Sequence, residues 1–121
     1  MRGSDSYTKY ENQVVRKYRD NLNHAESVED VKKFFSYTMQ ELMDKVFDGQ
    51  LNLRYEDVQL AVNSNPAYTI SNKLRQQTAF KHVWQDSDLS NIVDRMAESA
   101  LNRFRHLSDN PVKTNAKFNR H

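Results

Sequence analysis

The chain has 121 residues, 37% of them apolar and 28% charged, and this suits one polar, soluble domain with a single core. No apolar run is long enough to cross a bilayer, and the polar start MRGSDS cannot act as a secretory signal. The absence of cysteine excludes disulfides, thiol catalysis and thiolate metal sites, and it favours a cytoplasmic protein. Met-Arg-Gly-Ser also opens many recombinant proteins, so these residues need not be native.

Charge is distributed unevenly along the chain although the net value is only +2. Residues 1–24 sum to +2, residues 25–50 to −3, residues 51–86 to +1 and residues 87–121 to +2. Such a modest balance does not by itself indicate a polyanionic partner, and complementary packing or solvation explains the pattern more simply.

The first helix is predicted over about residues 7–22, with Ser4 or Ser6 as its cap. Its apolar positions form one narrow stripe at three- and four-residue steps: Tyr7, Tyr10, Val14, Tyr18 and Leu22. Tyrosine tolerates partial exposure, because the ring can be buried while the hydroxyl stays in water. A polar turn over residues 21–26 then allows an antiparallel hairpin with the next helix.

The strongest helical pattern covers residues 27–49, SVEDVKKFFSYTMQELMDKVFDG. Ser27 followed by Asp30 predicts an N-cap, and Gly49 stands where a left-handed C-cap would end the helix. The apolar residues share one face, which other segments must cover: Val28, Val31, Phe35, Met39, Leu42, Met43 and Val46.

Between residues 50 and 85 the pattern is less regular. Leu51 and Leu53 alternate with polar residues and read as an extended linker that anchors two leucines in the core. A short helix is predicted over Tyr55–Asn63, a break at residues 64–66, and a further helix from about Asn72 to Gln85. No strand is predicted, since Leu51–Tyr55 has no candidate partner strand.

The final helix is predicted from a cap at residues 86–88 through to Leu107. The fold class is therefore all α: a compact bundle of four to five helices. Residues 1–6 are predicted to be a flexible N-terminus, residues 7–108 the domain, and residues 109–121 a disordered basic tail. The residues predicted to be buried are Phe35, Leu42, Met96 and Phe104.

Catalytic and metal-binding patterns are weak in this chain. Its two glycines cannot build a phosphate loop or a dinucleotide turn, which need several glycines at fixed spacing. His82 and Asp86 lie one helical turn apart, a spacing far more typical of an ion pair than of a metal site. The carboxylates read as solvated helix faces, so we expect no enzyme, no cofactor and no metal.

Two cations interrupt the apolar stripes. The simplest interpretation is that Lys32 and Arg103 lay their methylene groups over apolar surface while their charged ends reach water at a helix end. For Arg103 the alternative is pairing with an acidic group of a neighbouring helix or of a partner.

Two function classes follow. The first is a non-enzymatic, regulatory, adaptor-like protein-interaction module whose partner is another protein or a second copy of the chain, and its candidate contact residues are Tyr7, Tyr10, Tyr18, Trp84 and Arg103. The alternative is a DNA-binding regulator in which residues 55–83 form a loose helix-turn-helix. Its candidate contacts to bases and phosphates are Ser71, Asn72, Lys73, Arg75, Gln76 and Gln77. No membrane partner is expected.

Overall fold

The computed structural model describes residues 6–109, and these residues are mostly helical. The predicted N-terminal segment up to residue 5 and the tail from residue 110 lie outside the described residues. Within the described part, the all-α prediction is confirmed, with the addition of a small two-stranded sheet.

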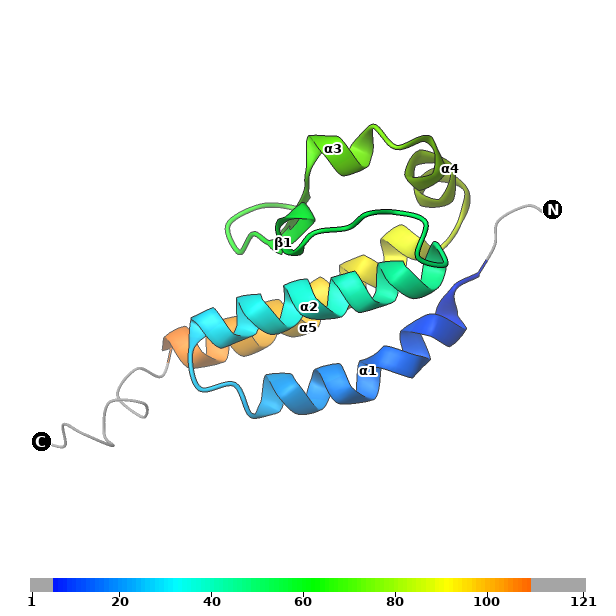
Figure 1. Ribbon diagram of the computed structural model, residues 1–121. Helices are drawn as coiled ribbons and strands as arrows, with labels where there is room; N and C mark the ends of the chain where they lie inside the picture. Colours follow the sequence, from blue (N-terminus) through cyan, green and yellow to red (C-terminus); the bar gives the residue numbers. More distant parts are fainter. Residues whose placement is uncertain (1–5, 110–121) are drawn as a thin grey trace, which may run out of the picture.

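Three long helices form the body of the molecule: α1 (Thr8–Asn23), α2 (Val28–Val46) and α5 (Leu89–Asp109). Figure 1 shows that α1 and α5 run in the same direction and that α2 runs opposite to both. Each of the three helices packs against the other two. The antiparallel hairpin predicted for the first two helices is therefore present, and α5 closes the group.

Helix α2 begins and ends where the sequence predicts. The Ser27 hydroxyl oxygen accepts a hydrogen bond from the Asp30 backbone N–H at 3.1 Å, which satisfies one free donor of the first turn. At the other end both Asp48 and Gly49 adopt positive φ, and the Gly49 N–H donates to the Asp44 carbonyl at 3.0 Å. Glycine takes this left-handed backbone without a Cβ penalty, so the helix stops here.

The segment after α2 corrects the sequence-based prediction. In place of a helix over residues 55–63, the chain forms a 3₁₀ turn, η1 (Tyr55–Asp57), followed by strand β1 (Val58–Leu60). Strand β1 pairs antiparallel with β2 (Tyr68–Ile70), with Gln59 opposite Thr69. Each strand buries its two outer residues and exposes its middle one, which is the two-residue period of a strand.

The hairpin packs on α2 and two short helices complete the cover (Figure 1). The buried Ser36 hydroxyl of α2 donates to the Val58 carbonyl at 3.1 Å and ties the sheet to the helix. Helices α3 (Asn72–Arg75) and α4 (Thr78–Asp86) follow, and they replace the single helix predicted for residues 72–85. The predicted start at Asn72 is confirmed, with Ser71 as its side-chain cap.

The core lies between the three long helices and under the hairpin. Of the four residues predicted to be buried, Phe35, Leu42 and Met96 are almost completely inaccessible. Phe104, in the last turns of α5, is only partly buried. Leu51 and Leu53 extend from the linker onto the core, as predicted.

Candidate partner-binding site

The five residues predicted to contact a partner do not form one surface. Tyr7 and Tyr10 stack on each other at the start of α1, with ring centroids 6.1 Å apart. Trp84 lies in another cluster, where it stacks on Phe80 at 5.2 Å and meets Tyr68 edge-on. These rings are partly buried against the core, so most of their area is already used within the fold.

Tyr18 is not available to a partner. Its side chain is 1% exposed, and its hydroxyl donates to the Met96 carbonyl of α5 at 2.7 Å. Burial raises the pKa of the Tyr18 phenol far above its usual range. Tyr18 is therefore wrong as a candidate contact residue, because α1 packs its apolar stripe against α2 and α5.

Arg103 pairs with backbone rather than with an acidic side chain. Its Nη2 donates to the carbonyl of Asn23, the last residue of α1, at 3.2 Å and to that of Ala25, two residues later, at 2.9 Å. These carbonyls lack helical partners, and a cation is favourable at the negative end of a helix dipole. Lys32, the other stripe-breaking cation, has its Nζ 5.9 Å from the centre of the Phe104 ring, consistent with the extended arrangement predicted for it.

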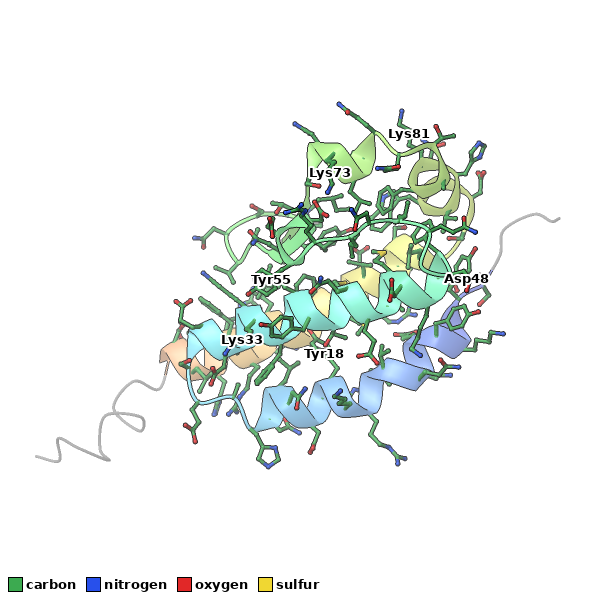
Figure 2. The ribbon with its side chains drawn as sticks, in the orientation of Figure 1. Tyr18, Lys33, Asp48, Tyr55, Lys73 and Lys81 are labelled. Atoms are coloured by element: carbon green, nitrogen blue, oxygen red, sulfur yellow. The ribbon has the colours of Figure 1, made fainter. Side chains whose placement is uncertain are left out.

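The surface that the sequence analysis missed is centred on Tyr37 of α2. It is 54% exposed and is the only large hydrophobic side chain exposed to this degree among residues 6–109. The Tyr37 ring meets Tyr55 of η1 edge-on, with centroids 5.2 Å apart, and Figure 2 shows Tyr55 beside α2. A signal was present in the sequence, since Tyr37 is an aromatic residue that lies outside the apolar stripe of its own helix.

Next to Tyr37 is a small groove between α1 and α2, with a volume of about 180 Å³. Its accessible apolar surface comes from Phe34 and Tyr37 of α2, because Val14 and Tyr18 beneath it are almost completely buried. The polar groups come from Lys17, Asn21, Thr38 and Glu41. The groove thus combines an aromatic edge with side chains of opposite charge. We call Phe34, Tyr37, Tyr55 and the residues lining this groove the Tyr37 surface.

The helix-turn-helix prediction fails at its first helix, because residues 55–70 form η1 and the hairpin. Helix α3 has only four residues, and its cations are engaged within the fold. The Arg75 Nε donates to the Ile70 carbonyl at 3.1 Å, and the Lys73 Nζ lies 3.8 Å from Asp57. Ser71 caps α3 and donates to Asp57, while Asn72, Gln76 and Gln77 are exposed.

The Asp57 carboxylate is the group that Ser71 and Lys73 contact at the start of α3. Burial alone would raise the pKa of its carboxyl, but the Ser71 hydroxyl, the Arg54 backbone N–H and the charges of Lys73 and Arg54 outweigh burial, so the pKa is lower than usual. The Ser71 and Arg54 hydrogen bonds measure 2.6 and 2.7 Å. This arrangement joins η1 to α3 and has a structural role.

Within the described residues, no three histidine or acidic side chains come close enough to hold a metal ion together. The His82 Nδ1 lies 3.7 Å from an Asp86 carboxylate oxygen, one helical turn away as the spacing predicts, and both side chains are largely exposed. Burial, followed by the nearby Asp94 carboxylate, raises the pKa of Tyr68 above its usual range.

None of the described helices is both long enough and apolar enough to span a membrane.

Comparisons of the chain with protein-family models, with curated proteins and with solved structures find no match.

Proposed function

We propose that the protein is a non-enzymatic, adaptor-like interaction module that binds a segment of a partner protein at the Tyr37 surface. The observation that carries this proposal is the 54% exposure of Tyr37, which lines a small groove together with the partly exposed Phe34. An amphipathic aromatic side chain of this kind is a typical anchor of protein interfaces, because it offers a large apolar area together with a hydroxyl.

The size and charge of the groove define the partner segment. A volume of about 180 Å³ is well below that of a drug-sized pocket and suits one inserted side chain. Phe34 and Tyr37, the apolar lining residues that remain accessible, favour an apolar group. Lys17 and Glu41 carry opposite charges, so we expect the inserted residue to be flanked by polar residues of both signs.

The contact between Tyr37 and Tyr55 also favours binding. Tyr55 meets the Tyr37 ring edge-on, which restricts its rotamers before any partner arrives. A side chain that is already restricted loses less entropy on binding, so more of the contact energy appears as affinity.

The test is a random-peptide display selection against the whole chain, followed by titration of a selected peptide. We expect Tyr37→Ala to weaken binding by about tenfold or more, as an anchor residue does when it is truncated. The matched control is Lys81→Ala, an exposed change on α4, and it should leave affinity unchanged. Selected peptides that bind both variants like the unchanged protein would contradict the proposal.

A second copy of the chain is the other possible occupant of this surface. Light scattering across a concentration series separates the two cases. A dimer that Tyr37→Ala dissociates would show that the partner is the protein itself.

A further inference from the structure

A second groove lies between the C-terminal halves of α1 and α5, and it is unrelated to the Tyr37 surface. Its volume is about 380 Å³. Its lining comes from two helix faces: Arg19, Leu22 and Asn23 of α1, and Ser99, Asn102, Arg103 and His106 of α5. We propose that this groove binds the phosphate group of a ligand.

The charge of the lining supports an anionic ligand. Arg19 and Arg103 bring two permanent positive charges, and no aspartate or glutamate of the described chain lines the groove. Asp20, next to Arg19 in sequence, lines the neighbouring hollow, which shares Arg19 and Asn23 with this groove, and one of its carboxylate oxygens is 3.8 Å from His24. Glu98 of α5 lines the hollow beside the hairpin loop.

The neutral groups of the groove complete a set of donors. Asn23 and Asn102 carry side-chain amides on opposite walls, and both residues are exposed. Guanidinium and amide N–H groups are the donors that proteins use for phosphate oxygens, and bonds to an ionised acceptor are shorter and stronger than neutral ones. Arg19 and Asn23 are one turn apart on α1, as are Asn102 and His106 on α5, so each wall presents two side chains on the same helix face, about 6 Å apart along the axis.

Arg103 gives the groove its rigidity. Its bonds to the Asn23 and Ala25 carbonyls fix the end of α1 against α5. They also place a positive charge beside carbonyls that would otherwise repel an anion at the C-terminus of a helix. The two walls are therefore held in place before a ligand binds, which lowers the entropy cost of binding.

The same phosphate chemistry occurs in small phosphate esters and in the backbone of nucleic acids, and two probes distinguish these sources. Inorganic phosphate is titrated by calorimetry at constant ionic strength, and a short DNA duplex is titrated by fluorescence anisotropy over a series of salt concentrations. The test variant is Arg19→Ala combined with Asn102→Ala, which changes two exposed side chains and leaves Arg103 in place. Arg105→Ala is the matched control, because Arg105 is exposed on the same turn of α5 but does not line the groove.

We expect phosphate to bind the unchanged protein and the Arg105→Ala control, and to bind the double variant about tenfold or more weakly, as the loss of charge-assisted hydrogen bonds predicts. If only the duplex binds the double variant more weakly than the control, the groove takes backbone phosphates. The slope of log affinity against log salt concentration should then be smaller by about one unit in the double variant, because one arginine is lost. Failure of both probes to bind overturns the proposal. An equal loss of binding affinity in Arg105→Ala and in the double variant also overturns the proposal, because the overall positive charge of the protein would then explain the affinity. Circular dichroism of each variant checks that the fold is retained.

Discussion

Asp57 shows what one buried carboxylate does in this fold. It is 3% exposed, yet it is ionised because a hydroxyl, a backbone N–H and two cations surround it. A buried charge is tolerated only when its hydrogen bonds are made, and removing one partner costs more than the bond contributes. Asp57 thereby fixes both the turn before β1 and the start of α3 after β2.

The pH dependence of this site can be predicted. The folded-state pKa of Asp57 is lower than its unfolded value, so its stabilisation is present above the unfolded pKa and is lost as pH falls through the folded pKa. We expect Asp57→Asn to lower the free energy of unfolding by about 1–3 kcal/mol at neutral pH, the usual cost of an unmatched buried polar group. The difference in the free energy of unfolding between Asp57→Asn and the unchanged protein should become smaller below about pH 4.

Urea unfolding of both proteins at neutral and at acidic pH measures this difference. Glu56→Gln, an exposed change next in sequence, is the control and should show little difference at either pH. A difference between Asp57→Asn and the unchanged protein that stays constant from neutral to acidic pH would be inconsistent with an ionised Asp57.

At the scale of elements, the notable feature is the parallel pairing of α1 with α5. Parallel neighbours place like ends of their dipoles together, which is mildly unfavourable. Polar contacts tie the pair along its length: Asp88 at the start, Glu11 with Arg95 and then Tyr18 with Met96 in the middle, and Arg103 at the end. The hydrogen bonds to Glu11 raise the pKa of the Arg95 guanidinium, as expected for a close pair.

Asp88 supplies the cap that α1 lacks. Of the two caps predicted for α1, Ser4 lies outside the described residues, and Ser6 only accepts a long hydrogen bond of 3.4 Å from the Thr8 N–H, since Tyr7 is the N-cap residue. The Tyr7 backbone N–H and the Ser6 and Thr8 hydroxyls donate to the Asp88 carboxylate at 2.8–3.1 Å. These bonds offset the effect of burial and lower the pKa of Asp88. A carboxylate also suits the positive start of a helix.

We expect Asp88→Ala to release the first turn of α1 and to lower the free energy of unfolding by about 1–2 kcal/mol, the range for loss of a helix cap. Hydrogen exchange should accelerate at the amides of residues 7–11 and remain slow in α2. Asp44→Ala, an exposed change on α2, is the control. Uniform acceleration across all three long helices would contradict a local role for Asp88.

At the scale of the whole molecule, three long helices make the core, and the hairpin with α3 and α4 covers one side of it (Figure 1). Phe35 lies at the centre of this arrangement and Phe104 near its edge. We therefore expect Phe35→Ala to lower the free energy of unfolding by about 3–5 kcal/mol, the usual cost for a buried aromatic side chain.

Phe104→Ala should lower the free energy of unfolding by about half as much as Phe35→Ala or less, because the Phe104 ring already contacts solvent and its removal leaves a smaller cavity. Chemical denaturation of the two variants under one set of conditions gives the comparison. Equal losses would show that the end of α5 is as well packed as its middle.

Much of the fold could be predicted from the sequence because long amphipathic helices carry strong local signals. The cap at Ser27, the left-handed end at Gly49 and the stripes of α2 and α5 were all read from residue spacing. The hairpin could not be predicted in this way, because each strand has only three residues and the central paired residues, Gln59 and Thr69, lie ten positions apart. A pattern so short fits a helix or a strand equally well until pairing decides between them.

The candidate site depended on the tertiary structure almost entirely. The sequence alone determined an all-helical class, the absence of thiol chemistry and the absence of glycine-rich phosphate loops, because these follow from composition and local spacing. Only the packing decided that Tyr18 is buried and Tyr37 exposed, since tyrosine is intermediate between core and surface residues and its ring can be buried or exposed. Packing also decided that Arg103 meets the end of α1, because that contact joins residues 78 and 80 positions apart, and no local pattern encodes such a distance.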